Sequence, residues 1–168
     1  ENEDAAVETA TAILETFPAV CRDFWVAGMR AKLGLFDSRE DDAELAQALL
    51  ALMRDEGADY TRTLRDLGRD DPPDTPFFRG PGFRGWRERW EARLARQRQP
   101  LQEARALMRS RNPAVIPRNR RVEEALEAAT QGDESVLHRL LAALEKPYED
   151  IPAHAGFAEP PAPTAGTY

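Results

Sequence analysis

The stretch FRGWRERWEARL, residues 83–94, determines the class of fold. Its large apolar side chains are spaced by three and then four residues, at Phe83, Trp86, Trp90 and Leu94. Residues three and four positions apart lie on the same face of an α-helix. This spacing therefore predicts an amphipathic helix whose aromatic face is buried and whose arginine-rich face is solvated.

The same spacing recurs on both sides of this stretch. Similar apolar stripes begin at Val7, Cys21, Leu45, Tyr60, Leu101, Val122 and Leu137. Pro18 separates the first two stripes, so we expect two helices there, the second ending near Gly34. Residues favourable to helices dominate the composition, and aromatic and β-branched residues are sparse. The sequence predicts an all-α fold of about seven or eight amphipathic helices in an irregular bundle.

Capping residues and prolines indicate where these helices begin and end. Ser38 with Asp41 is typical of a capping box, and Asp59 and Asn119 are expected to cap later helices. Gly132-Asp133 reads as a helix stop followed by a new N-cap. The Pro-rich residues 68–85 are expected to form a loop. We expect residues 1–149 to be helical and residues 150–168 to be an extended Pro/Ala-rich tail that is ordered only on a partner surface.

The net charge of −7 conceals two oppositely charged parts. Residues 79–121 contain 13 Arg and 3 acidic residues, a net charge of +10, which leaves −17 for the remainder. The basic part is expected to face an acidic surface or a polyanion. No apolar run approaches the ~20 residues of a membrane helix, so we expect no membrane partner. The single cysteine excludes an internal disulfide and fits a cytoplasmic location, which we expect.

Several motifs have a possible chemical role and a simpler structural one, and we favour the structural one in each case. Gly80, Gly82 and Gly85 match G-x-G-x-x-G, but no strand precedes them and Pro81 removes a backbone donor, which favours a turn. His138 and His154 lack further ligands at zinc spacing. Two acidic clusters could act as acid and base or bind a cation, although capping and solvation explain them: Asp41, Asp42 and Glu44, and Asp70, Asp71 and Asp74.

The same reasoning applies to the remaining candidates. Cys21 lies on an apolar face beside Phe24, so a buried and inert thiol is expected. Trp86 and Trp90 suit a core, a protein interface or, least of all, stacking on nucleic acid. Arg118 is either solvated or pairs with a carboxylate of a neighbouring domain. We predict no catalytic, cofactor-binding or metal-binding residue, and we name as possible interdomain contacts Arg118, Asn119, Trp86 and Trp90.

An ordered set of short segments adds a resemblance to a known family. They are MRAKLGL at 29–35, LLALM at 49–53, GADYT at 57–61, MRSRNP at 108–113, IPRN at 116–119, VEEA at 122–125, GD at 132–133 and KPY at 146–148. In this order and spacing they resemble the C-terminal part of the SelO/YdiU family (UPF0061). The resemblance spans roughly Phe17 to Tyr148.

The resemblance implies a parent about three times as long with a kinase-like fold. Members of the family are pseudokinases that transfer AMP from ATP to protein hydroxyls (AMPylation) with a divalent metal, Mg or Mn. Their nucleotide- and metal-binding motifs lie upstream of the matched region, so none transfers to a residue here. Arg120 stands where many members have His. The terminal Cys or selenocysteine of the family is absent, so we expect no redox control in this chain.

We therefore expect a structural, non-catalytic C-terminal fragment of a SelO-like adenylyltransferase. It would pack on the upstream kinase-like domain, and in isolation it would expose apolar surface and form a non-native dimer. ATP and Mg or Mn would belong to the full-length protein. The alternative is a stand-alone helical protein–protein interaction module. Least favoured is a nucleic-acid-binding helical domain that uses residues 79–121.

Overall fold

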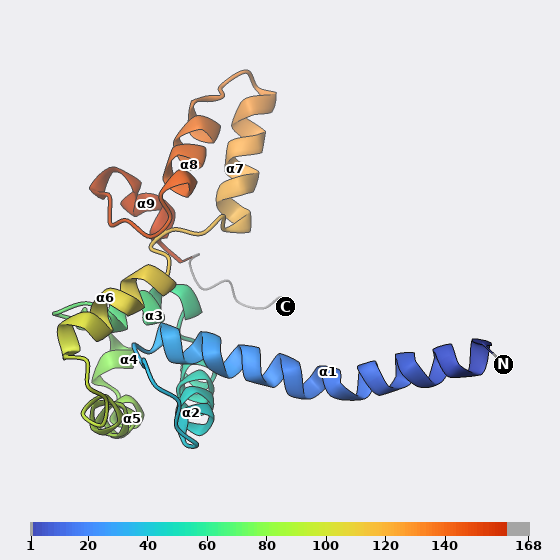
Figure 1. Ribbon diagram of the computed structural model, residues 1–168. Coiled ribbons are helices and arrows are strands. Elements are labelled where there is room, and N and C mark those ends of the chain that lie inside the picture. Colours follow the sequence, from blue (N-terminus) through green and yellow to red (C-terminus); the bar gives the residue numbers. More distant parts are fainter. Residues whose placement is uncertain (1, 161–168) are drawn as a thin grey trace.

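A computed structural model describes residues 2–160, with side chains described from residue 5, and this part contains helices and no strand. Nine α-helices and one short 3-10 helix follow one another along it (Figure 1). They are α1 (Asn2–Lys32), α2 (Asp42–Asp55), α3 (Tyr60–Leu67), α4 (Pro76–Arg79), α5 (Pro81–Leu94), α6 (Leu101–Arg111), α7 (Asn119–Thr130), α8 (Ser135–Glu145), η1 (Pro152–His154) and α9 (Ala155–Ala158). The all-α prediction is confirmed.

Helix α1 is one continuous helix, so the predicted break at Pro18 is wrong. A proline inside a helix removes one backbone hydrogen bond, but its fixed φ is helical. Pro18 is exposed, so water can solvate the carbonyl that its ring leaves without a partner. Only the last turns of α1 enter the core, through Met29, and Leu33 directly after the helix is buried there as well. The remainder projects away from all the other helices (Figure 1).

The hydrophobic core lies among the end of α1 and helices α2, α3, α5 and α6. The predicted stripe of α5 is buried, which confirms the helix at residues 83–94. Trp86 and Trp90 stack with ring centroids 5.8 Å apart. Their indole N–H groups donate to the carbonyl oxygens of Leu45 at 2.8 Å and Leu33 at 2.9 Å. Each buried indole thus keeps a polar partner while it joins α5 to α2 or to the residue that follows α1.

Close packing of helices fixes two glycines. Gly34 has φ +75°, and a Cβ there would lie 2.9 Å from the carbonyl oxygen of Ala104. Gly82 lies within α5, where a Cβ would lie 2.8 Å from a side-chain carbon of Leu52.

The predicted loop at residues 68–85 is only partly a loop, because it contains α4 and the start of α5. Thr75 caps α4, whose first residue is Pro76, and α5 begins at Pro81.

Helices α7 and α8 form a hairpin that stands beside the core (Figure 1). Gly132, with φ +89°, ends α7, and Asp133 N–H donates to the carbonyl of Ala128, so the predicted stop is confirmed. Glu134, not Asp133, is the N-cap of α8, although the Asp133 carboxylate accepts from Ser135 N–H. The sequence patterns missed η1 and α9 in the expected tail, and residues 161–168 lie outside the described residues.

Candidate functional site

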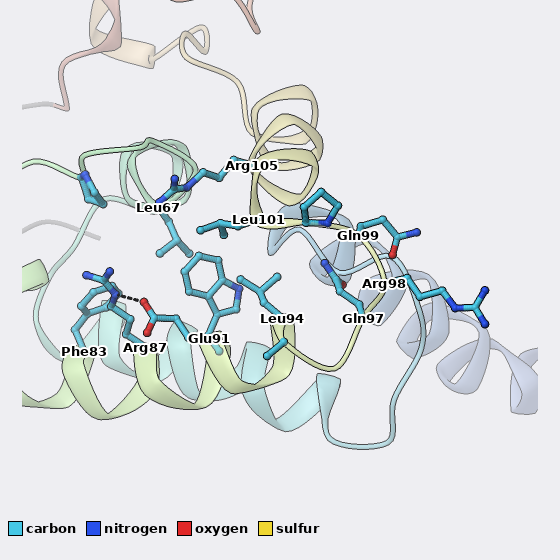
Figure 2. Close-up of a pocket in the computed structure, with 14 residues that line it drawn as sticks. Leu67, Phe83, Arg87, Glu91, Leu94, Gln97, Arg98, Gln99, Leu101 and Arg105 are labelled. Carbon is cyan, nitrogen blue, oxygen red and sulfur yellow. Dashed lines mark hydrogen bonds and ion pairs between the residues drawn. The ribbon is translucent and has the colours of Figure 1, made fainter.

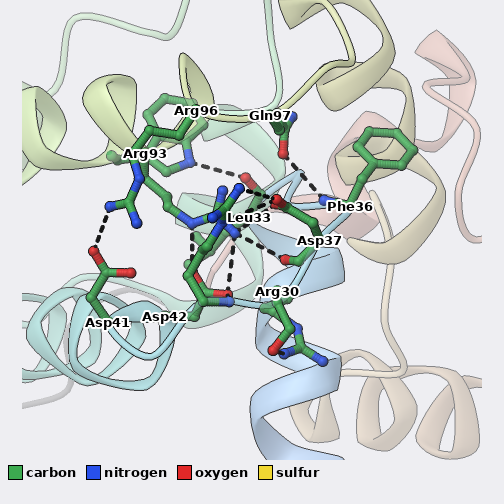
Figure 3. A network of polar contacts seen from close by, with 12 residues as sticks. Arg30, Leu33, Phe36, Asp37, Asp41, Asp42, Arg93, Arg96 and Gln97 are labelled. Atoms are coloured by element: carbon green, nitrogen blue, oxygen red, sulfur yellow. Dashed lines mark hydrogen bonds and ion pairs between the residues drawn. The ribbon is translucent and has the colours of Figure 1, made fainter.

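Three Arg–carboxylate pairs connect the start of α2 to α5 and the turn that follows it, and we call them the ion-pair ladder. Its rungs are Glu44–Arg89 at 2.7 Å, Asp42–Arg93 at 2.6 Å and Asp41–Arg96 at 2.7 Å. The side chains of Arg93 and Asp42 are only 2% and 0% exposed, whereas the outer rungs face solvent. Figure 3 shows the two rungs that involve Asp41 and Asp42. The first acidic cluster thus neutralises arginines of the same chain.

The central rung is held in place by further hydrogen bonds. Arg93 also donates to the carboxylate and the backbone carbonyl of Asp37, each at 2.9 Å. Asp42 accepts from the backbone N–H of Arg39 at 2.9 Å. Hydrogen bonding from Arg93 holds the pKa of Asp37 below its ordinary value, and Arg96 does the same for Asp41. Asp41 is the N-cap of α2 but makes no side-chain capping bond, which corrects the expected capping box.

A second polar centre surrounds Arg65 of α3. Its guanidinium donates to the carbonyls of Arg109 at 2.7 Å and Asn112 at 2.9 Å, at the end of α6. It also donates to the carbonyl of Tyr148 at 3.0 Å and to the carboxylate of Asp150 at 2.6 Å. One buried arginine therefore ties the segment after α8 to the core. Sequence reasoning missed this residue because its partners are distant along the chain.

Arg118 pairs with Asp59 through two hydrogen bonds of 2.8 and 2.9 Å. Burial opposes ionisation of Asp59, but Arg118 and the N–H of Arg62 outweigh burial and lower the pKa of Asp59. Asp59 caps α3 as predicted. Asn119 does not cap α7: it is the first residue of that helix, and Arg118 is the N-cap. The carboxylate partner of Arg118 thus lies in this chain and not in a neighbouring domain, which corrects the expectation from the sequence.

The four candidate interdomain contacts are therefore placed as follows. Trp86 and Trp90 are 3% and 5% exposed inside the core, which leaves them little surface for another domain. Arg118 faces α3, and Asn119 is exposed at the start of α7. The structure thus brings the two tryptophans together but does not join them to Arg118 and Asn119 in one patch.

Other predicted residues differ in their surroundings from what the sequence suggested. Cys21 is exposed, so the prediction of a buried thiol is wrong: no other described element covers its side of α1. Gly80 is the N-cap of α5, while Gly82 and Gly85 are helical, so the glycine motif is no phosphate loop. In the second acidic cluster, Asp70 pairs with Arg105 and Asp74 with Arg79.

A cavity of about 460 Å³ lies beside α5 (Figure 2). Its apolar wall includes Leu67, Phe83, Trp90, Leu94 and Leu101. The guanidinium groups at its rim belong to Arg87, Arg98 and Arg105, and those of Arg87 and Arg105 are engaged by Glu91 and Asp70. None of its lining residues is a Ser, Cys or His nucleophile or base. The one carboxylate among its lining residues, that of Glu91, accepts a hydrogen bond from Arg87 at 2.7 Å.

Within residues 2–160, no three His, Cys, Asp or Glu side chains are placed to hold a metal ion together. No helix in that range has the length and apolarity needed to cross a membrane.

The most extensive uncovered feature is the apolar side of α1. Six large side chains along it are between 45% and 76% exposed, namely Val7, Ile13, Leu14, Phe17, Val20 and Phe24. Isolated exposed apolar residues are common, but a contiguous row of them marks a surface that another element covers. This row is the strongest candidate for an interface in the chain.

Comparisons with known proteins agree on one family. The profile described as protein adenylyltransferase SelO matches residues 5–145. Protein nucleotidyltransferase YdiU of Syntrophotalea carbinolica is 51% identical over 98% of this chain and 34% of its own length. YdiU of Brevibacillus brevis is 44% identical over 100% and 34%, and that of Geobacillus kaustophilus 45% over 100% and 35%. The chain thus spans about a third of the length of these relatives, and it belongs to the protein adenylyltransferase SelO family.

Proposed function

We propose that this chain is the structural, non-catalytic C-terminal helical region of a SelO-type protein adenylyltransferase. The remaining two-thirds of such a protein would bind ATP and a divalent metal. There, the oxygen of a Ser, Thr or Tyr hydroxyl would attack the α-phosphorus of ATP, and pyrophosphate would leave. This chain would support that part and complete its fold.

The observation that carries the proposal is the engagement of charged groups within the chain. The carboxylates of the ion-pair ladder and Asp59 each accept hydrogen bonds from arginines at 2.6 to 2.9 Å. A Mg²⁺ ion needs carboxylate oxygens that are free to coordinate it. A general base likewise needs a carboxylate or imidazole within reach of the substrate proton. These four carboxylates therefore do not fit a metal site or a general base, in keeping with catalysis elsewhere in the protein.

The same engagement argues against the nucleic-acid alternative. Within residues 79–121, nine arginines form ion pairs with acidic residues: Arg79, Arg87, Arg89, Arg93, Arg96, Arg105, Arg118, Arg120 and Arg121. Phosphate binding requires cationic groups that are available to replace condensed counterions. Both tryptophans of α5 are buried, so they offer no stacking platform.

A chimera provides the test. In the S. carbinolica relative, the third that matches this chain is replaced by this chain. ATP labelled at the α-phosphate is then supplied with Mg²⁺ or Mn²⁺ to the isolated chain, the chimera and the unmodified relative, and label on protein is measured. We expect none on the isolated chain and comparable labelling of the other two. Robust labelling of the isolated chain would falsify the proposal, and so would a folded chimera that stays unlabelled while the relative is labelled.

A further inference from the structure

We propose that the uncharged stripe of α1 is the surface on which this chain packs against the catalytic part of its own polypeptide. This inference rests on the proposed function, since it names the partner and the surface that a structural role requires. It concerns residues 6–24, which precede the part of α1 that enters the core.

The stripe is wide, long and free of charge. At ~100° per residue, its members fall within an arc of about 140° and extend for about 27 Å along the helix. They are Ala6, Val7, Ala10, Ile13, Leu14, Phe17, Val20, Cys21 and Phe24, and all are exposed. A soluble helix normally turns such an arc toward a core. Here the polar residues lie on the opposite side of the helix, as they would with one side buried.

The core of this chain does not supply the missing contact. Met29 and Leu33 are buried, but on the helical wheel they lie about 100° or more from the centre of the stripe. In Figure 1 the first two-thirds of α1 extends away from every other helix. The covering element must therefore come from outside the described residues.

The charges on the polar face of α1 argue against a lipid membrane as the surface that covers the stripe. A helix that lies on a membrane surface carries Lys and Arg on its polar face. Over residues 6–24, the polar face of α1 instead carries Glu8, Glu15 and Asp23, against the single cation Arg22. Anionic headgroups would repel this face, so a protein surface is the better occupant.

Two protein surfaces could cover the stripe: a second copy of this chain, or the rest of the same polypeptide. The width of the stripe and the length of the relatives distinguish between them. A two-stranded coiled coil with a second copy uses two rows of apolar residues per helix. The stripe has a third row, Ala6, Ile13 and Val20, which gives it the breadth of a helix packed into a globular core. Relatives are about three times as long as this chain, so two-thirds of each polypeptide is available to form such a core. We therefore assign the stripe to the catalytic part of the same protein.

Cys21 is a natural probe because it lies on the stripe and is the only cysteine of the chain. The isolated chain and the chimera are treated with N-ethylmaleimide under native conditions, and the peptide that contains Cys21 is quantified by mass spectrometry. We expect alkylation in the chimera to be at least about tenfold slower, because covered groups react only after local opening. The inference is overturned if a monomeric chimera is alkylated as fast as the isolated chain.

Matched variants separate docking from general instability. Phe17→Asp with Phe24→Asp places two charges on the stripe, and Ala12→Asp with Ala19→Asp places two on the opposite, exposed side. Both pairs should leave core unfolding of the isolated chain unchanged. In the chimera, only the phenylalanine pair should restore fast alkylation of Cys21. Equal effects of the two pairs would contradict the assignment.

A second copy of the chain or a membrane, in place of the catalytic part, would each give a different experimental result, and either result would overturn the inference. A second copy would protect Cys21 in a concentration-dependent manner and give a dimeric chimera. A membrane would be indicated by cosedimentation of the chimera with phosphatidylglycerol vesicles. AMP labelling is a separate readout, so a protected Cys21 in an unlabelled chimera would remove the proposed function and leave the docking surface.

Discussion

Replacing Arg93 by Met tests the central rung of the ion-pair ladder. The Arg93 side chain is 2% exposed and bonds Asp42 at 2.6 Å, whose own side chain is 0% exposed. Removal of one partner of a buried pair leaves an uncompensated charge and costs about 3–5 kcal/mol. The backbone N–H of Arg39 still donates to Asp42, so we expect a loss of about 3 kcal/mol, near the lower limit.

Urea unfolding followed by far-UV circular dichroism measures this loss. With an m-value of about 2 kcal/mol/M, the transition midpoint should fall by about 1.5 M. Arg96→Met is the matched control, because it removes the adjacent rung, whose side chains are 49% and 53% exposed. Exposed pairs contribute at most about 1 kcal/mol, so the control should shift the midpoint by less than about 0.5 M.

The double variant Arg93→Met with Asp42→Leu extends this reasoning. Hydrophobic replacement of an entire buried pair is often neutral or stabilising, so it should recover most of the loss. One η-nitrogen of Arg93 is buried without a hydrogen-bond partner, which adds a cost that the double variant removes. Equal midpoint shifts for Arg93→Met and the exposed control would refute the argument that burial sets the value of each rung.

Three further predictions concern the backbone and pH. Gly34→Ala should lower the free energy of unfolding, measured in urea, by more than about 2 kcal/mol, because a Cβ would meet the backbone of α6. Gly57→Ala is the control: Gly57 has a similar positive φ but open space around the position of a Cβ, so this variant should cost about 1 kcal/mol. A lowered pKa means that the ionised Asp59 carboxylate stabilises the fold above the pKa of about 4 that an unfolded aspartate has. This stabilisation should be lost as the pH falls below about 4, and the loss should be smaller in Arg118→Gln. Proline inside a helix costs about 3 kcal/mol relative to alanine, so Pro18→Ala should stabilise the helical form of the exposed part of α1 by about that amount. The helical circular dichroism of the isolated chain should then increase, and an unchanged signal would contradict the prediction.

Periodicity predicted most helices because each has one buried side. The stripe at residues 83–94 became α5, and Gly132 ended α7 where its positive φ allowed it. The predicted break at Pro18 is wrong because the rule that proline ends a helix assumes that water cannot replace the backbone hydrogen bond that proline removes. Helix α4 was missed although Thr75-Pro76 is a start signal, since four residues are too few to show periodicity.

Neither the polar centres nor the exposure of Cys21 could be read from the sequence. Arg93 and Asp42 are 51 residues apart, and Arg65 and Asp150 are 85 apart. A charged residue has the same local signature whether its partner is water or a distant carboxylate. Likewise, an apolar stripe indicates that one side of a helix is to be covered, but not by which element, so Cys21 was assigned to a core that this chain does not provide.

The stacked indoles of α5 give the protein a built-in optical reporter. Trp86 and Trp90 are nearly parallel and fixed by hydrogen bonds to the carbonyls of Leu45 and Leu33, so their near-UV circular dichroism depends on native packing and is lost when packing loosens. Trp25 is the third tryptophan and lies on α1, only partly buried. It packs against the edge of the core, so all three indoles belong to the same packed region. Near-UV dichroism can therefore follow the packing of the core without any added dye.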